Sequence, residues 1–314
     1  MKARENILLL SEKGILNSEN EPYPNVPFQD EPVGTGDVYR DNVAVIVGKH
    51  AVWTFTSGKW NQIVVTETRL NCICWTSDKR LLVGTESARL AWVSDGDLKF
   101  IDSFDKVPER GLWKTPWGGP PDVRSLAVSS GGTIYANVHV GWIVRSRNWG
   151  KTWKNLCEGL EMDVHQVSTH PLNPAIVFAA TAEGFYLSKD HGETFNRQIN
   201  SMPYRYQRAC ACFPDRNAYL LSTSRGPHGY AEARIYRSED DGKHWEPVNG
   251  LPEGISNNIN TFQIIIVRDG NALVIVEDTS VYKTNDYGMN WEKVRDDYTK
   301  LYGALVIPKG CRIS

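Results

Sequence analysis

The sequence predicts an all-β protein that folds as a closed seven-bladed β-propeller of four-stranded antiparallel sheets. One eight-residue phrase, Ser/Thr-x-Asp/Asn-x-Gly-x-x-aromatic, occurs four times and begins at Ser146, Ser188, Ser238 and Thr284. A spacing of roughly 40 to 50 residues between copies is typical of a propeller or another repeat architecture. Apolar strand–turn–strand hairpins also recur along the chain, including stretches that lack the phrase.

The repeated phrase predicts a tight turn with a structural role. In the first copy, Ser146 and Asn148 stand two residues apart, so both side chains can bond the backbone of a turn. Gly150 supplies the positive φ that such a turn needs. The aromatic residue that ends each phrase begins the next strand and is expected to pack between sheets. These aromatic residues are Trp153, Phe195, Trp245 and Trp291.

One repeat shows the pattern of a blade. Alternating and β-branched residues predict strands over 124–128, 133–138, 142–146 and 152–156, from the innermost strand outward. The hairpin between the second and third strands recurs near 7–18, 43–54, 81–93, 133–146, 176–188, 218–238 and 272–284. The innermost strands are expected to begin at Asn71, Arg124, His165, Arg208, Phe262 and Tyr302, with a seventh within 30–42.

The two ends of the chain are expected to complete one blade together. No hairpin follows the strand 302–307, and no innermost strand precedes the hairpin 7–18. Pairing between them closes the ring and leaves no open sheet edge, so residues 1–314 are predicted to form a single domain. Six blades are the alternative, because the segment 19–42 is rich in Pro, Gly and Asp and is also compatible with a loop.

Charge and composition exclude several classes of function. The formal net charge of -2 gives no electrostatic reason to expect nucleic acid or an anionic membrane as a partner. The apolar run at residues 7–10 is too short for a signal peptide or a membrane span, so we expect a cytoplasmic location. The pairs Cys72/Cys74 and Cys210/Cys212 are interpreted as core residues in preference to a metal site. The sequence leaves the oligomeric state open.

The predicted topology places the loops on two faces. The turns of the repeated phrase lie on one face, and the connections between blades lie on the other, which we call the top face. The top loops are longer and richer in aromatic residues, which favours a binding site there. The segment 105–122 is expected to place Trp113 and Trp117 on the top rim, and the loop 224–233 contributes His228.

Polar residues stand at the start of the innermost strands, where the blades converge on the mouth of the channel. Alignment by apolar residues places Asn71, Arg124, His165, Arg208, Phe262 and Tyr302 at one position. The position two residues earlier holds Arg69, Asp122, Asp163, Tyr206, Asn260 and Lys300. We expect the charged members of this set to form a polar ligand pocket, although any single one can be merely solvated. Because Arg grips carboxylates and phosphates with two bonds, the expected ligand is a small anionic or sugar-like molecule.

The repeated phrase resembles the Asp-box, or BNR repeat, of sialidase-like β-propellers. The resemblance covers residues 43–295 and is identified most closely with uncharacterised bacterial WD40/YVTN/BNR-like repeat proteins. That superfamily also includes xyloglucan-cleaving glycosidases, sortilin-type receptors and a photosystem II assembly factor. The resemblance implies that the Asp boxes are structural turns apart from the active site. The sequence lacks the Arg-Ile-Pro motif of sialidases, so a typical sialidase is not expected.

Two classes of function fit these observations. The first is an enzyme, a glycosidase-like or other hydrolase or lyase, in which Asp122 or Asp163 acts as acid or base and is tuned by Arg124 and His165. Its ligand-binding residues would be Arg69, Trp113, Trp117, His139, Arg208, His228 and Tyr302, with the two tryptophans as a stacking lid. In a variant, His139, His165 and a carboxylate hold a divalent metal ion at the channel mouth. The second class is a non-catalytic scaffold that binds a protein or glycan on its top face.

Overall fold

A computed structural model describes residues 6–308 of the chain. Six of its sheets have four antiparallel strands, and each sheet runs from an innermost to an outermost strand. In that order they are β3 (Val33–Tyr39), β4 (Asn42–Val47), β5 (Ala51–Thr56) and β6 (Lys59–Val65); β7 (Leu70–Trp75), β8 (Leu81–Thr85), β9 (Leu90–Ser94) and β10 (Asp97–Phe100); β11 (Val123–Val128), β12 (Ile134–Val138), β13 (Ile143–Ser146) and β14 (Lys154–Leu156); β15 (Val164–Thr169), β16 (Val177–Thr181), β17 (Gly184–Ser188) and β18 (Asn196–Gln198); β19 (Cys210–Phe213), β20 (Ala218–Thr223), β21 (Arg234–Ser238) and β22 (Glu246–Pro247); and β23 (Ile264–Arg268), β24 (Asn271–Val276), β25 (Ser280–Thr284) and β26 (Glu292–Arg295).

The seventh sheet closes the ring as predicted. It contains β1 (Asn6–Ser11), β2 (Gly14–Leu16) and β27 (Leu301–Ile307), in the order β2-β1-β27. Strand β27 pairs with β1 over a register that runs from Asn6 opposite Ile307 to Leu10 opposite Gly303. The protein is therefore a seven-bladed β-propeller, and the six-bladed alternative is wrong because residues 33–39 form the strand β3.

The closing sheet differs from the others in having three strands. Its outermost position is held by a single bridge between Leu16 and Pro22. Pro22, Pro24 and Pro27 follow β2 closely, and proline has no N–H to donate to a strand ladder. A fourth strand is therefore reduced to one bridge.

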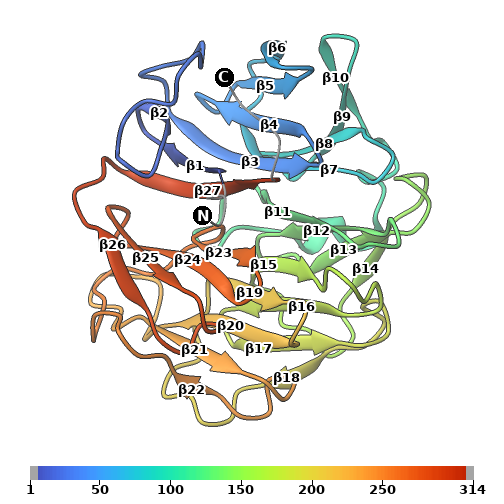
Figure 1. The fold of residues 1–314 in the computed structure, drawn as a ribbon. Helices are drawn as coiled ribbons and strands as arrows, with labels where there is room; N and C mark the ends of the chain where they lie inside the picture. The colour runs from blue at the N-terminus through green and yellow to red at the C-terminus, as the bar shows by residue number, and fades with distance from the viewer. Residues whose placement is uncertain (1–5, 309–314) are drawn as a thin grey trace.

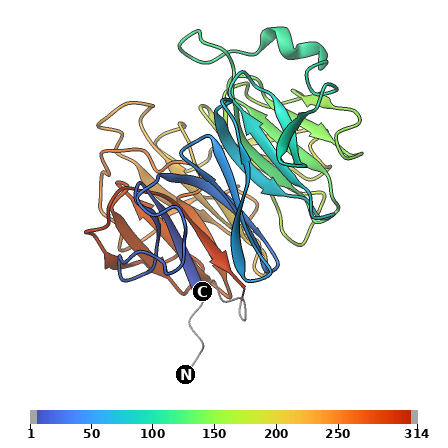
Figure 2. The same cartoon turned by 90° about the horizontal axis from the view of Figure 1, so that it is seen from above.

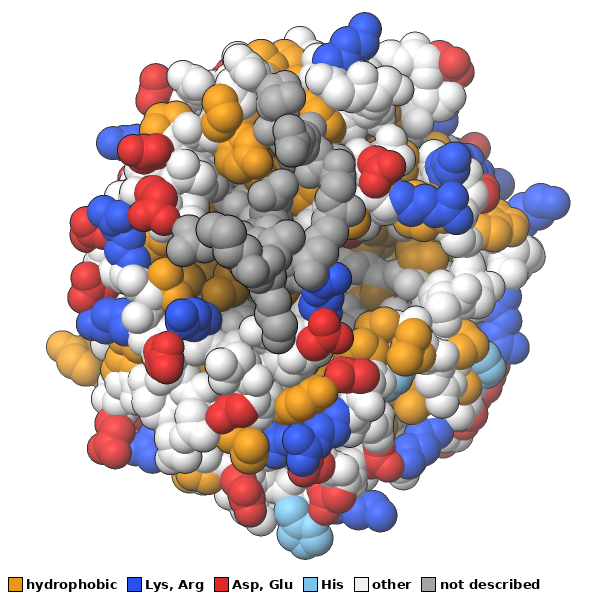
Figure 3. Space-filling model, viewed as in Figure 1, with side chains coloured by type: hydrophobic (Ala, Val, Ile, Leu, Met, Phe, Trp, Pro, Cys, Tyr) orange, Lys and Arg blue, Asp and Glu red, His pale blue; other side chains and the backbone are white. Residues whose placement is uncertain are grey.

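The views down and across the ring show how the blades are arranged. In Figure 1 the innermost strands, from β3 to β27, surround the centre, and the outermost strands lie at the rim. In Figure 2 the connection between β10 and β11, which includes the 3-10 helix η1 (Pro108–Leu112), projects from one end of the sheets. Acidic and basic side chains are interspersed around the rim of the face shown in Figure 3. No helix of residues 6–308 is long and apolar enough to cross a membrane.

The predicted cysteine pairs lie in separate parts of the core. Cys72 and Cys74 pack in the cluster around Phe104. Cys210 and Cys212 pack in a different cluster, which contains Phe178, Phe185 and Trp245. All four are buried and carry free thiols. Because each pair is enclosed by apolar side chains of its own cluster, the interpretation as core residues is confirmed.

The four repeated phrases form turns with one hydrogen-bond pattern. In each, the hydroxyl of the first residue accepts a bond from the glycine N–H, at 2.8 Å in the first two copies and at 3.0 and 3.2 Å in the others. The same hydroxyl donates to Oδ1 of the Asn or Asp two residues later. The φ angles of Gly150, Gly192, Gly242 and Gly288 are 80°, 82°, 79° and 84°. These hydrogen bonds and positive φ angles explain why each phrase folds into a tight turn.

We predict that Gly242→Val destabilises the protein by ~1–3 kcal/mol. Gly242 has a φ of 79°, and an added Cβ would lie 3.1 Å from Cβ of Gln198 and 3.2 Å from the ring of Phe185. A β-branched residue resists both the dihedral angle and the crowding. Urea denaturation checks this prediction, with Gly34→Val as a control because a Cβ there has no neighbour within 4 Å. Equal stability of the two variants would contradict it.

Candidate functional site

Two polar residues at the strand entrances, Arg124 and His165, occupy equivalent β-bulges. The pairing of β11 with β12 skips Arg124, and the pairing of β15 with β16 skips His165. The same one-residue register shift occurs at the corresponding place in three other blades. It falls at Gly34, Asn71 and Tyr302. A bulge leaves its extra residue outside the ladder and redirects the side chain, a device often found beside active sites.

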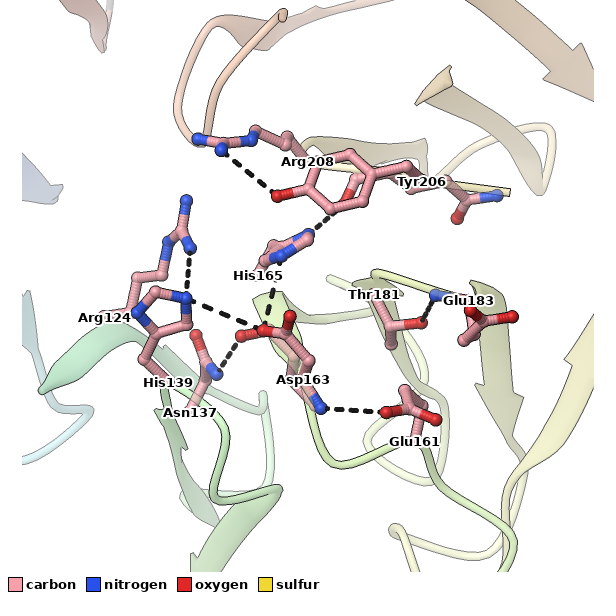
Figure 4. Close-up of polar contacts among 12 residues, drawn as sticks. Arg124, Asn137, His139, Glu161, Asp163, His165, Thr181, Glu183, Tyr206 and Arg208 are labelled. Carbon is pink, nitrogen blue, oxygen red and sulfur yellow. Dashed lines mark hydrogen bonds and ion pairs between the residues drawn. The ribbon is translucent and has the colours of Figure 1, made fainter. Parts of the chain in front are cut away.

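Six side chains from three consecutive blades converge at this end of the sheets (Figure 4). We call them the top-face cluster. They are Arg124, His139, Asp163, His165, Tyr206 and Arg208. Nη1 of Arg124 lies 3.2 Å from Nε2 of His139. Oδ1 of Asp163 lies 3.6 Å from Nε2 of His139 and 3.4 Å from Nε2 of His165. The two imidazoles therefore face one carboxylate from neighbouring blades.

The third blade adds a phenol and a second guanidinium. Arg208 donates from Nη2 to the hydroxyl of Tyr206 at 3.1 Å and from Nη1 to Oδ1 of Asn260 at 2.9 Å. The ring of Tyr206 packs on the ring of His165, with centroids 4.7 Å apart. The hydroxyl of Thr261 donates to the backbone carbonyls of His165 and Arg208. These contacts tie the third blade to the carboxylate centre.

A buried hydrogen-bond network supports the cluster from below. Ser125 donates to Oδ1 of Asn137 at 3.0 Å, and Asn137 donates to the carbonyl of Val164 at 2.7 Å. The N–H of Val167 donates to the hydroxyl of Ser125. Ser125 and Asn137 are fully buried and link β11 and β12 to β15. Since buried polar networks fix geometry when every member is paired, this network holds His165 in position relative to Arg124.

Burial and neighbouring charges set the protonation of the cluster. Burial, reinforced by the charge of Arg208, lowers the pKa of Arg124 to about 10. Burial also lowers the pKa of His165, and burial with the charge of Arg124 lowers the pKa of His139 to about 4. Burial opposes ionisation of Asp163, but His165, His139 and Arg124 outweigh it and lower the pKa of the carboxyl. At neutral pH the centre therefore holds a carboxylate and two neutral imidazoles.

The two tryptophans predicted for the top rim lie in different environments. Trp117 is 73% exposed, and its ring contacts the ring of His139 edge-on, with centroids 5.4 Å apart. Trp113 is only 6% exposed and packs against Phe104 at a centroid distance of 5.5 Å. The prediction of Trp113 as part of a lid is therefore wrong, because its ring fills the core beneath η1.

The other predicted residues lie around the cluster or away from it. Asp122 bonds Asn71 in the preceding blade, and burial raises the pKa of its carboxyl. Arg69 is exposed and lies close enough to Asp122 to act on this carboxyl. His228 is exposed in its loop. Tyr302 is half-buried on β27, with its ring 5.8 Å from Nζ of Lys300.

Sequence reasoning omitted three residues of the site. Tyr206 and Asn260 occupy the same aligned position as Asp163, so the register contained the signal that places them beside Arg208. Gln207 contributes its backbone carbonyl, which bonds Nδ1 of His165. A carbonyl leaves no trace in the residue type, so no sequence pattern could have indicated it.

A depression of about 340 Å³ lies elsewhere, between the turns of two neighbouring blades. Its lining includes Lys189, Asp190, Asp241 and Lys243. Nζ of Lys189 lies 2.5 Å from Oδ2 of Asp241, and Asp190 is engaged in its own turn. Because Lys189, Asp190 and Asp241 are already paired within the protein, the depression is not a candidate for the main site.

Fold and site together define a seven-bladed β-propeller with a charged and aromatic cluster at one end of its innermost strands. No family model matches the chain. A probable oligoxyloglucan-reducing end-specific xyloglucanase of Neosartorya fischeri is 24% identical over 175 residues, which are 52% of this chain and 20% of the relative. A xyloglucanase of Hypocrea jecorina is 29% identical over 181 residues, which are 56% of this chain and 21% of the relative. The chain thus spans about a fifth of the length of these curated relatives.

Two solved structures share the fold over most of the chain. A structure described as YCF48 bound to D1 peptide matches with a TM-score of 0.61 and 13% identity and covers 87% of both chains. The WD40 β-propeller domain of Doa1 matches with a TM-score of 0.60 and 14% identity, over 84% of this chain and 82% of that one. At such identities the likeness shows the fold alone.

Proposed function

We propose that the protein is a glycosidase-like hydrolase that binds a small anionic, sugar-like molecule at the top-face cluster. The observation that carries this proposal is the pair of guanidinium groups without an acidic partner. Within residues 6–308, neither Arg124 nor Arg208 forms an ion pair with a carboxylate. Arg124 contacts an imidazole, and Arg208 contacts an amide and a phenol. Two cations in a partly buried site favour an anionic guest, and Arg binds carboxylates and phosphates in bidentate fashion.

The surrounding groups are those that a sugar-cleaving site needs. Most glycosidases use two carboxyl groups, one on each side of the bond that breaks. Asp122 and Asp163 reach the same end of the sheets at the same register in neighbouring blades, and we assign them these two roles. Trp117, exposed beside His139, offers the flat apolar surface on which a sugar ring can stack.

The similarity to two xyloglucanases over about half of the chain supports carbohydrate chemistry. The charges of the cluster favour an acidic sugar over a neutral one. We further propose that the four turns are Asp boxes, since they share the hydrogen-bond pattern that the phrase predicts. A cytoplasmic location is in keeping with the free thiols of Cys72, Cys74, Cys210 and Cys212 and is proposed on that ground.

The proposal is tested with aryl glycosides that differ only in charge. We expect release of the aryl alcohol from a glucuronide and not from the matching glucoside. Asp163→Asn and Asp122→Asn are each expected to lower kcat by ~100-fold or more, because each removes one of the two carboxyl groups. Asp278→Asn, in the turn between β24 and β25 of another blade, serves as the control for loss of a carboxylate outside the cluster.

Two results would contradict the proposal. Faster cleavage of the glucoside than of the glucuronide would show that the arginines do not select an acid. Anion binding that depends on Arg124 and Arg208, without turnover of any substrate, would identify the cluster as the binding site of a non-catalytic scaffold.

A further inference from the structure

The centre of the top-face cluster poses a hydrogen-bonding problem. Oδ1 of Asp163 and Nε2 of His165 lie 3.4 Å apart, yet neither atom has a hydrogen-bond partner within residues 6–308. His165 is fully buried, so water does not solvate the ring from outside. An unpaired polar atom in such a place costs about 1–3 kcal/mol and calls for an explanation.

The second nitrogen of His165 decides what Nε2 can offer. Nδ1 contacts the backbone carbonyl of Gln207. A carbonyl oxygen only accepts hydrogen bonds, so Nδ1 carries the proton, and the neutral ring presents a lone pair at Nε2. That lone pair faces the carboxylate of Asp163, which is itself an acceptor. Two acceptors that face each other at 3.4 Å repel, and a metal cation between them would relieve that repulsion.

His139 presents a lone pair to the same space. The group nearest its Nε2 is Nη1 of Arg124, at 3.2 Å. A guanidinium only donates, so Nε2 of His139 is also an acceptor. His139, Asp163 and His165 each offer one ligand atom to this space, and the three atoms lie within 4.8 Å of one another. Three acceptor atoms from two blades thus converge on one point.

We propose that His139, Asp163 and His165 bind a divalent transition-metal ion, of which Zn²⁺ is the representative. Imidazole nitrogen and carboxylate oxygen lie about 2.0–2.2 Å from Zn²⁺, and a tetrahedral arrangement then separates ligand atoms by about 3.4 Å. The distances from Oδ1 of Asp163 to the two imidazole nitrogens are 3.4 and 3.6 Å. The ligands are thus spaced for an ion without rearrangement of the backbone.

The surroundings of the three ligands resemble those of metal sites. A histidine that binds a metal usually donates its other ring N–H to a carbonyl or carboxylate, and Gln207 fills that role for His165. The set of two imidazoles and one carboxylate leaves coordination positions for water or substrate, as in catalytic sites. Arg124 opposes the ion, because its charge lies next to His139 and its Nη1 occupies the lone pair that the metal would use.

This metal site deepens the proposed function but does not depend on it. If the protein hydrolyses an acidic sugar, the ion would supply Lewis-acid chemistry, and Asp163 would serve as its ligand in place of the acid–base role assigned to it above. Metal binding is measured without any substrate, so its failure and the failure of the hydrolase proposal are separate results.

The test uses the full chain, freed of metal by a chelator and titrated with Zn²⁺ in a calorimeter. We expect about one ion per chain, with release of few protons because both imidazoles already present lone pairs. With Co²⁺ in place of Zn²⁺, we expect visible absorption bands of a site with nitrogen and oxygen ligands. His139→Gln and Asp163→Asn are expected to weaken binding by ~100-fold or more.

Two controls separate this site from other metal ligands. His50→Gln removes an exposed histidine and Cys157→Ser an exposed thiol, and neither should change binding. Arg124→Met should strengthen binding by ~10-fold, because it removes a like charge and frees Nε2 of His139. Tighter Zn²⁺ binding cannot arise from misfolding. The Arg124→Met variant therefore tests the proposal even if a variant of a ligand residue is unstable.

The inference is wrong if the wild-type chain binds no ion under these conditions. It is equally wrong if His139→Gln, Asp163→Asn and Arg124→Met all bind Zn²⁺ as the wild type does, since the ion would then lie elsewhere.

Discussion

Deletion of residues 301–314 is expected to abolish cooperative folding of the propeller. Strand β27 is the innermost strand of the closing blade, and it pairs with β1 from Asn6 to Ser11. Its apolar residues Leu301, Ala304, Leu305 and Ile307 are buried. At about 1.5–3 kcal/mol for each large side chain, their loss removes roughly 5–9 kcal/mol, which is comparable with the whole stability of a typical protein. The deletion also exposes the edge of β1.

Thermal unfolding followed by circular dichroism measures this effect. The truncated chain should show a broad, weak transition and a tendency to aggregate, whereas the full chain should unfold in one step. Leu301→Asp tests the same contact by a single substitution, because Leu301 is fully buried. Val65→Asp is its control, since Val65 is 68% exposed on β6. An unchanged melting transition in the truncated chain would show that the ring does not depend on closure.

The blades could be predicted from the sequence because their signals are local. Alternation within a strand and a fixed turn phrase each depend on a few neighbouring residues. Even ring closure followed from counting elements, since the strand 302–307 and the hairpin 7–18 each lacked a partner. The loss of the fourth strand from the closing blade was not predicted, because the prolines after β2 affect pairing and not the count of repeats.

The sequence predicted which residues of the site lie at equivalent positions of their strands, but no more than that. Alignment of the strands placed Arg124 and His165 at equivalent positions, and the structure confirms this equivalence by a shared β-bulge. The same alignment could not predict the direction in which a side chain of a loop points. Trp113 and Trp117 are four residues apart in one loop, yet one ring enters the core and the other is exposed. That difference depends on the path of the loop, which its composition does not determine.

The hydrogen bonds between neighbouring blades could not be predicted from the sequence either. The tautomer of His165 is set by a backbone carbonyl of the next blade, and the support of Asn137 reaches the carbonyl of Val164. Such contacts join residues that are distant in sequence through groups common to every residue type. A sequence pattern therefore identifies the candidates, whereas the three-dimensional register decides which of them meet.

Arg124→Met is expected to stabilise the free protein and to weaken anion binding. The pKa of Arg124 is about 10 in the folded protein, below its ordinary value of 12.5, because burial and Arg208 disfavour its charge. A folded pKa below the unfolded one means that the charged form destabilises the fold at every pH below about 10, and that this cost fades between pH 10 and 12.5. After allowance for solvent screening, we expect a gain of about 1–2 kcal/mol at neutral pH.

Methionine keeps most of the apolar stem of arginine and removes only its charge and donors, so packing beside His139 should be conserved. The lost charge-assisted bonds should weaken the binding of an anionic sugar by roughly 10- to 100-fold, which corresponds to about 1.5–3 kcal/mol. Thermal melts with and without glucuronate measure both effects at once.

Arg145→Met is the control, because Arg145 is buried at least as deeply as Arg124 but is paired with a carboxylate. Its Nη2 lies 2.7 Å from Oε1 of Glu193, and its Nη1 donates to the carbonyl of His191 at 2.7 Å. The same substitution should therefore destabilise the protein there and leave anion binding unchanged. If Arg124→Met stabilises the protein and Arg145→Met destabilises it, the charge of Arg124 does not contribute to the stability of the fold. If both variants lost stability, Arg124 would be a structural residue and the anion site would lose its main support.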